Sequence, residues 1–447
     1  MGKRKTLWFR VPADADAPPL ISETVGFTRL LSRPAQSHRM EVDVLDSHDA
    51  RLLRAGIVVA HRRRNDEQAQ WYIAAPSWPG IPDEASFNVS EVEELPESLR
   101  SKLSLFLRQQ PIGPFAAMVC DRREYMLRGG DADLVAIRDD VITIARGGVT
   151  LSKTREITMT PQVKLQAQQR EFIVSALEAV DASPMGVLPS LQQRIGPPAT
   201  GLTSFRKPAG VHDDMNLEEF VCEIFLKHLH ALVIAELEQR PDRERRILEE
   251  LQLDLRGLAL VLEPAWREML EADVRSLRTT SSNERQPALL RVLDALVGAA
   301  RAPKLGDLSV EQARVALSSR VEQALVILFD RCRALELDGP DEAWGAALRS
   351  ATQLQATIRL LEMLFGKPAR KLGKEIDGVL TLLRSSVLPP DDIELVGLSA
   401  HEAFQLGRDV EHARWSVEKA RRELIDTWPE HVAGSRKALK KMRRKIG

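Results

Sequence analysis

Residues 42–64 read VDVLDSHDARLLRAGIVVAHRRR, and WYIAAP follows at 71–76. Residues 50–55 look helical, whereas 56–61 and 71–75 alternate between apolar and polar positions as β-strands do. Similar short runs, separated by turn residues, occur at 6–11, 117–120, 134–138 and 149–159. The pattern predicts an antiparallel sheet up to about residue 160, interrupted by a further helix over 96–109.

The hydrophobic period changes from residue 216 onward, where long amphipathic helices are expected. Capping signals and apolar stripes predict helices over 216–239, 242–277, 285–300, 309–335, 341–365, 367–385 and 399–426. The segment 184–210 is rich in Pro and Gly, which favours a linker. The predicted fold class is therefore α+β, with an N-terminal antiparallel β-barrel over 1–183, a linker over 184–210, an all-α helical bundle over 211–433 and a tail over 434–447.

Charge is distributed unevenly along the 447 residues. The whole chain has a net charge of −1, but residues 1–210 carry +2, residues 211–433 carry −10, and the last fourteen residues hold seven basic groups and no acid. Near-zero net charge argues against sequence-independent or sequence-specific nucleic-acid binding by the whole chain. The basic tail, with Lys437, Lys440, Lys441, Arg443 and Arg444, is expected to be solvated or to dock on the acidic bundle, a polyanion or an anionic membrane.

The three cysteines are odd in number and about a hundred residues apart, so they predict neither a disulfide framework nor a cysteine-based zinc site. No stretch reaches the roughly 20 apolar residues that a membrane-spanning helix needs. We expect a cytoplasmic protein without a transmembrane segment.

The stretch 42–76, followed by Asp121-Arg122-Arg123, Ile137 to Val141 and Arg155-Glu156-Ile157, resembles the CYTH (triphosphate tunnel) family in motif order and spacing. The resemblance covers about residues 1–200. It implies a tunnel-like barrel whose inward Arg and Lys side chains bind triphosphate while paired carboxylates hold Mg²⁺ or Mn²⁺. C-terminal to it, residues 346–368 resemble a helix of the CHAD domain, a helical module that binds polyphosphate.

The acidic and basic residues that both families use are largely replaced in this sequence. The Glu-x-Glu-x-Lys of the CYTH opening strand corresponds to Arg4, Thr6 and Trp8, and in the closing strand Glu156 is followed by Thr158 and Thr160. Threonine lacks the charge that binds a hard cation. The basic run of the CHAD helix reads Thr352, Gln353 and Gln355. These departures predict a diverged, non-catalytic protein.

Three functions follow as hypotheses. The first is binding of polyphosphate or another phosphorylated ligand, or a scaffold role, without a cofactor; Arg62, Arg64, Arg122 and Arg155 would hold the phosphates. The second is a metal-dependent inorganic triphosphatase with Mg²⁺ or Mn²⁺ on Asp46, Asp140 and Glu156, of which Asp140 and Glu156 would be catalytic. The third is an adaptor that binds a protein partner through the acidic bundle and the basic tail. Asp140 and Glu156 could instead be internal salt-bridge partners of Arg122 and Arg155.

Overall fold

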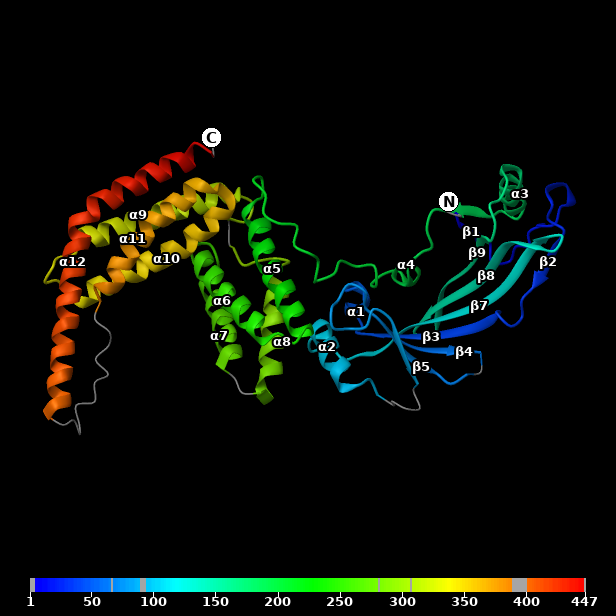
Figure 1. Cartoon of the computed structure of the whole chain (residues 1–447), viewed down its shortest axis with the longest axis horizontal. Coiled ribbons are helices and arrows are strands. Elements are labelled where there is room, and N and C mark those ends of the chain that lie inside the picture. Colours follow the sequence, from blue (N-terminus) through cyan, green and yellow to red (C-terminus); the bar gives the residue numbers. More distant parts are fainter. Residues whose placement is uncertain are drawn as a thin grey trace. The chain divides into compact units, whose positions relative to one another are not determined.

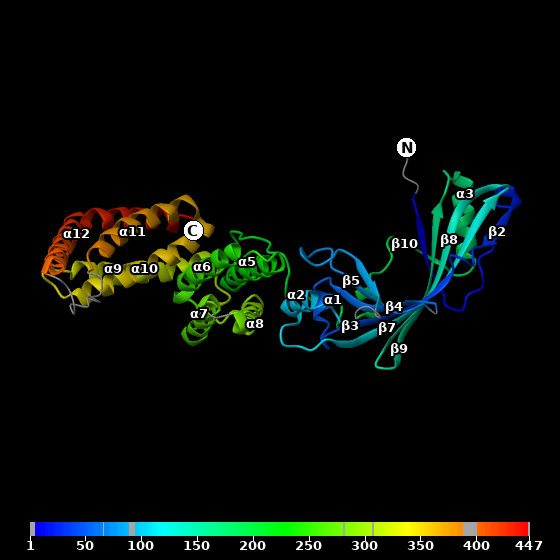
Figure 2. The same cartoon turned by 60° about the horizontal axis from the view of Figure 1, so that its bottom comes forward.

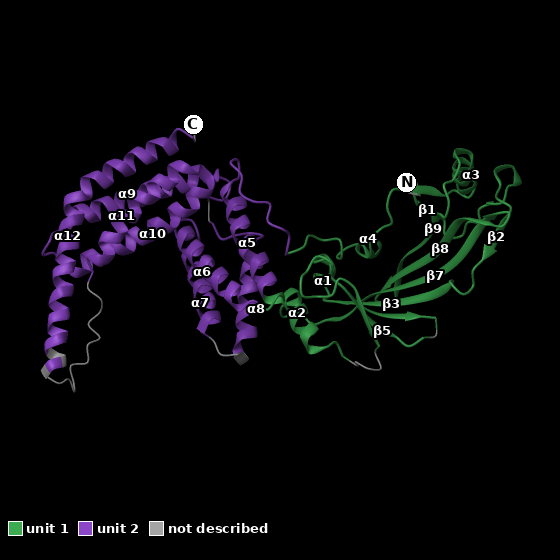
Figure 3. Ribbon diagram, viewed as in Figure 1, with its two compact units in different colours: residues 1–204, 236–239 green, residues 205–235, 240–447 purple. Residues whose placement is uncertain are grey.

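The computed structural model describes residues 5–65, 67–88, 94–279, 282–305, 308–387 and 400–445. They form two compact units, the first comprising 1–204 with 236–239 and the second 205–235 with 240–447 (Figure 3). The first unit is built on a β-sheet and the second on helices, so the structure confirms a chain of mixed α and β content.

The sheet of the first unit is antiparallel and has ten strands in the order β10-β1-β9-β8-β7-β3-β4-β5-β6, with β2 paired to β7 beside β3. The strands are β1 (Leu7–Val11), β2 (Arg29–Ser32), β3 (His38–Asp46), β4 (Val58–Arg64), β5 (Gln70–Ala74), β6 (Ala85–Asn88), β7 (Gly113–Gly129), β8 (Ala132–Arg146), β9 (Val149–Pro161) and β10 (Ser183–Met185). The long strands β7, β8 and β9 curve along the length of the sheet (Figures 1 and 2).

The structure does not confirm the predicted barrel, because the sheet is open. Among the described strands, the pairing runs from β10 to β6 and does not join these two edges. Both edges are short: β10 has three residues and β6 has four. Pro184 in β10 also lacks the backbone N–H that a further ladder would need.

Each face of the sheet packs an apolar core over part of its area. On one face, Phe9, Ile137 and Ile157 pack with Ile173 and Leu177 of helix α3 (Ala167–Glu178). On the other face, Val42, Val44, Ala60 and Ile142 pack with residues of helices α1 (Arg51–Arg54) and α4 (Leu191–Ile195). Helix α2 (Glu97–Leu107) buries Leu103 and Phe106, and Phe106 packs on Trp78. The segment 184–204, expected as linker, is therefore folded against the sheet.

The second unit consists of α5 (Leu217–Leu237), α6 (Pro241–Gly257), α7 (Pro264–Thr279), α8 (Ser282–Ala299), α9 (Ala313–Arg333), α10 (Asp341–Phe365), α11 (Lys367–Ser385) and α12 (Ala400–Arg443). The single helix predicted over 242–277 is wrong. A 3-10 turn, Leu258–Leu260, follows α6, and Pro264 is the first residue of α7. Proline cannot continue a helix because it lacks the N–H and clashes with the preceding turn, but it fits a first helical position.

Helix α12 is 44 residues long and contains Pro429. Figure 1 shows this helix bent between its orange and red parts. The part after Pro429 includes the basic tail expected at 434–447, whose last two residues lie outside the described residues. Within the described ranges, no helix combines the length and apolar character of a membrane-spanning segment.

Candidate functional site

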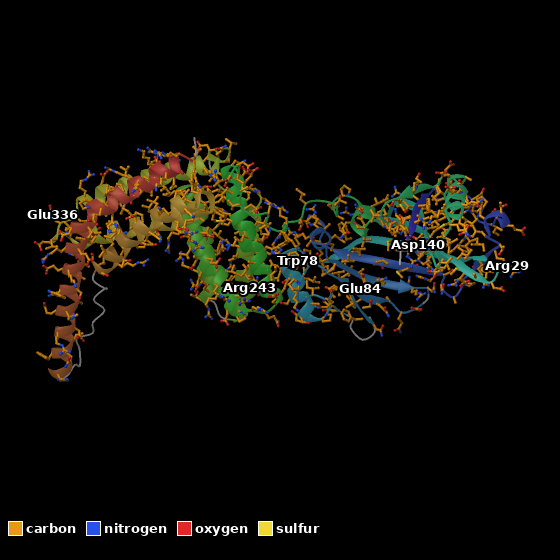
Figure 4. All side chains as sticks on the ribbon, turned by 45° about the horizontal axis from the view of Figure 1, so that its top comes forward. Arg29, Trp78, Glu84, Asp140, Arg243 and Glu336 are labelled. Carbon is orange, nitrogen blue, oxygen red and sulfur yellow. The ribbon has the colours of Figure 1, made fainter. Side chains whose placement is uncertain are left out.

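Strand pairing places five polar residues in one row across the sheet. Asp140 of β8 is paired with Arg122 of β7 and with Glu156 of β9. His38 extends the row beyond Arg122, and Arg10 extends it beyond Glu156. Directly paired residues project from the same face of a sheet, so the row defines what we call the arginine face. Figure 4 shows Asp140 within the sheet of the first unit.

Asp140 is held by two arginines. Arg122 donates from Nε to Oδ1 at 2.7 Å and from Nη2 to Oδ2 at 3.1 Å. Arg138, two residues along β8, places Nε 3.0 Å from Oδ2. The Asp140 side chain is only 6% exposed. Burial works to lower the pKa of Arg122, but the hydrogen bonds to Asp140 and its charge raise that pKa above the usual value. Asp140 is therefore an acceptor for arginines in this arrangement.

Glu156 is paired by Arg194 of α4, which the sequence analysis did not single out. Arg194 donates from Nη1 to Oε1 and from Nη2 to Oε2, the second at 2.7 Å. The Glu156 side chain is 3% exposed. Helix α4 begins at the N-cap Ser190, whose side chain accepts from the backbone N–H of Gln193. This Ser-x-x-Gln spacing is a capping signal that could have revealed the helix, though not the partner of its arginine.

Arg62 and Arg64 lie on the same face as Arg122. Arg64 is paired with Met40, and Met40 with Cys120, two residues before Arg122. At about 4.8 Å between strands and 3.3 Å per residue, the Cα atoms of Arg64 and Arg122 are separated by roughly 12 Å.

The two strand arginines have weak partners. Arg62 lies over the Tyr72 ring at 4.1 Å from its centroid and 3.9 Å from Glu84, and Nη2 of Arg64 is 3.3 Å from Nδ1 of His38. Among the described residues, Arg64 has no carboxylate at ion-pair distance. Guanidinium groups on this face therefore retain donors for an added anion.

Arg155 projects from the opposite face of the sheet. Arg155 is paired with Val141 of β8 in the sheet. It donates hydrogen bonds to Asp139, from Nε to Oδ1 at 2.9 Å and from Nη2 to Oδ2 at 2.8 Å. These hydrogen bonds raise the pKa of Arg155. The four predicted phosphate-binding arginines are thus divided, with three on the arginine face and Arg155 behind it.

Asp46 caps helix α1 with its carboxylate. Its oxygens accept from the backbone N–H groups of Ser47 at 2.7 Å, Leu52 at 2.9 Å and Leu53 at 2.8 Å. Burial raises its pKa despite these bonds. His38 lies in the row of Asp140, and Asp46 is eight residues further along β3, roughly 26 Å at 3.3 Å per residue. The structure therefore brings Asp140 and Glu156 together but not Asp46.

The carboxylates of this face do not fit a Mg²⁺ or Mn²⁺ site. Oxygen ligands lie about 2.0–2.6 Å from such ions, so ligands of one ion must converge. Asp140 and Glu156 are neighbours, but each is already paired with arginine. In the part of the chain that the structure describes, no three His, Cys, Asp or Glu residues converge as metal ligands.

The predicted basic tail is helical and lies on the helical unit. Ser435, Ala438 and Met442 are buried, and Arg443 pairs with Glu322 of α9, from Nε to Oε1 at 2.7 Å. Lys437, Lys440, Lys441 and Arg444 are exposed.

No protein-family model matches this chain, and no curated protein matches it. Among solved structures, a Pyrococcus horikoshii protein (PH1819) matches with 14% identity and a TM-score of 0.21, over 43% of this chain and 94% of its own. A proposed adenylate cyclase from Bacillus halodurans matches with 10% identity and a TM-score of 0.20, over 37% and 86%. A proposed adenylyl cyclase from Hippeastrum, described as having a dominant triphosphatase activity, matches with 12% identity and a TM-score of 0.24, over 44% and 98%. TM-scores this low establish no function, so the proposals below rest on the residues.

Proposed function

We propose that the arginine face binds a polyphosphate or another phosphorylated small molecule without hydrolysing it. The observation that carries the proposal is the set of Arg62, Arg64 and Arg122 on one face, with Cα atoms that span roughly 16 Å. Arginine suits phosphate because its planar fork donates two parallel hydrogen bonds. Arg62 and Arg64 have the fewest competing acceptors and would make the first contacts.

The buried ion pairs give this face its rigidity. Asp140 fixes Arg122 and Arg138, and Glu156 fixes Arg194, so these guanidinium groups are held in place before a ligand arrives. Preorganised donors lose less conformational entropy on binding. The same pairs oppose metal-dependent hydrolysis, because a cation would have to displace arginines from buried carboxylates.

Thermal unfolding with tripolyphosphate, in EDTA and then with Mg²⁺ or Mn²⁺, tests the proposal. A ligand at a hundred times its Kd stabilises a protein by about 2.7 kcal/mol, which corresponds to a rise of roughly 5–10 °C in the Tm of a unit of this size. We expect this rise in EDTA and its loss in the Arg62→Gln/Arg64→Gln variant. Absence of any shift with the wild-type chain would overturn the proposal.

A matched control uses the opposite face. Arg123 directly follows Arg122 but projects to the other side, and Arg39 is exposed there, so Arg39→Gln/Arg123→Gln removes the same charge from the same sheet. This control should keep the ligand-induced shift. Release of inorganic phosphate that requires Mg²⁺ and disappears in Glu156→Gln would instead establish the triphosphatase.

A further inference from the structure

The second unit carries a basic surface formed by two antiparallel helices, α11 and the end of α12. A Cβ built at Gly434 would lie 2.5 Å from the Glu375 carboxyl group, and one at Gly378 would lie 2.8 Å from His431. Lys445 Nζ donates to the carbonyl of Phe365 at 3.0 Å. Residue 431 thus lies beside residue 378 and residue 434 beside residue 375, so α12 runs antiparallel to α11, and Lys445 just beyond α12 reaches the end of α10.

The register places lysines of both helices side by side. On α11, Lys367, Lys371 and Lys374 precede Gly378 at helical spacing and share its flank, which faces α12. On α12, Lys437, Lys441 and Arg444 follow Gly434 at spacings of three, four and three residues, which places them within about 80° of Gly434 around the helix axis. These six residues form what we call the basic patch.

The charges of the basic patch are available to a partner. All six residues are exposed, and among the described residues none has an ion pair. Glu375, whose carboxyl group lies against Gly434, is 3.4 Å from Nδ1 of His431. The helix axes of such a pair lie about 8–10 Å apart, comparable with the Debye length at physiological salt, so the six charges reinforce one another. The basic patch contrasts with the rest of the helical segment, because residues 211–433 carry a net charge of −10.

We propose that the basic patch binds the surface of an anionic lipid membrane. Five of its six residues are lysines, whose hydrated ammonium groups on flexible stems suit a diffuse layer of lipid headgroups. Nucleic-acid sites usually add arginine forks for phosphate and aromatic rings for stacking, and the two stripes contain one arginine and no aromatic residue. The apolar side of this part of α12 is buried in the bundle, so binding is electrostatic and does not need insertion. The inference does not depend on the arginine face, which belongs to the other unit.

Co-sedimentation of the full chain with lipid vesicles tests this inference. We expect the wild-type chain to bind vesicles of equal parts phosphatidylcholine and phosphatidylserine, not to bind phosphatidylcholine alone, and to be released by salt. Each basic residue near an anionic surface contributes a factor of roughly five to binding. The variant Lys371→Gln/Lys374→Gln/Lys437→Gln/Lys441→Gln should therefore bind several-hundred-fold more weakly, by roughly that factor to the fourth power.

A control variant separates the position of the charges from their number. Lys5→Gln/Lys153→Gln/Lys164→Gln/Lys207→Gln removes four exposed lysines outside the basic patch and should bind as the wild type does. Equal weakening in both variants, or no binding of the wild type to anionic vesicles, would overturn the proposal. Binding to duplex DNA or RNA that depends on the four patch lysines, with no vesicle binding, would assign the surface to nucleic acid instead. Circular dichroism melting confirms that each variant is folded.

Discussion

Substitution of Arg194 by methionine should destabilise the sheet unit strongly. Methionine fills part of the space but leaves the Glu156 carboxylate, 3% exposed, without its bidentate partner. Removal of one member of a buried ion pair costs about 3–5 kcal/mol, because the remaining charge stays desolvated. For a unit of about 200 residues this lowers the Tm by roughly 6–20 °C.

The measurement is differential scanning calorimetry of the full chain, with tryptophan fluorescence in urea as a second probe. Arg39→Met is the matched control, since Arg39 is 53% exposed and its pairs with Glu41 and Asp121 lie on the surface. Exposed pairs contribute about 0–1 kcal/mol, so the control should change stability little. Glu156→Gln in the Arg194→Met background should recover at least half of the loss. Equal losses in Arg194→Met and Arg39→Met, or no recovery, would show that the pair is not what stabilises the unit.

Three further predictions concern packing and buried groups. Gly257→Ala should lower the free energy of unfolding of the second unit by roughly 1–3 kcal/mol, measured by chemical denaturation, because the new Cβ would lie 2.7 Å from the carbonyl oxygen of Ala356. Gly298→Ala in α8 is the control: its Cβ meets open space, so the substitution should be neutral or stabilising. Burial raises the pKa of Cys120 and Cys222 to about 11 and that of Cys332 to about 12. At pH 8 the thiols therefore stay protonated, and the first two should react with iodoacetamide roughly 100-fold, and Cys332 roughly 1,000-fold, more slowly than in the unfolded chain. Equal rates by mass spectrometry would contradict their burial. Arg421→Lys should lower the free energy of unfolding by roughly 1–3 kcal/mol, because Arg421 binds Asp341 and the Ser386 carbonyl beside the Trp344 ring. Arg422 is exposed, so Arg422→Lys should change the midpoint of chemical unfolding very little.

Local signals in the sequence predicted individual elements well. The alternation over 149–159 gave a strand that the structure has as β9, and the prediction over 341–365 coincides with α10. Both depend on short-range effects, namely the two-residue period of a strand and the helix stops at Pro340 and Gly366. Helix α3 was not predicted, because its capping box at Gln166 and Gln169 uses a residue that is uncommon at an N-cap.

The candidate site depended on information that local patterns do not contain. Arg155 and Glu156 are adjacent in a strand, so their side chains had to lie on opposite faces, but the face that each shares with Arg122 depends on strand register. The partner of Glu156 is Arg194, 38 residues later in a segment that composition assigned to a linker. Whether the sheet closes into a barrel depends on whether its two edge strands pair with each other. The sequence predicts strands but not this pairing. The sequence therefore identified the charged residues, but their roles depend on which strands and side chains pair in the folded chain.

The position of β1 has a consequence for how the chain folds during synthesis. β1 lies between β9 and β10, so residues 7–11 pair with residues 155–159 and 183–185. β1 is made before both of its neighbours: the partner residues in β9 follow about 150 residues later, and those in β10 about 25 residues after that. Contacts between such distant segments form slowly because of the entropy of closing a long loop. Until β9 and α3 have been made, the apolar residues Phe9 and Ile137 and the edges of β1 and β8 are uncovered, so a nascent chain stalled before β9 should be the form of this protein most prone to aggregate and to bind chaperones.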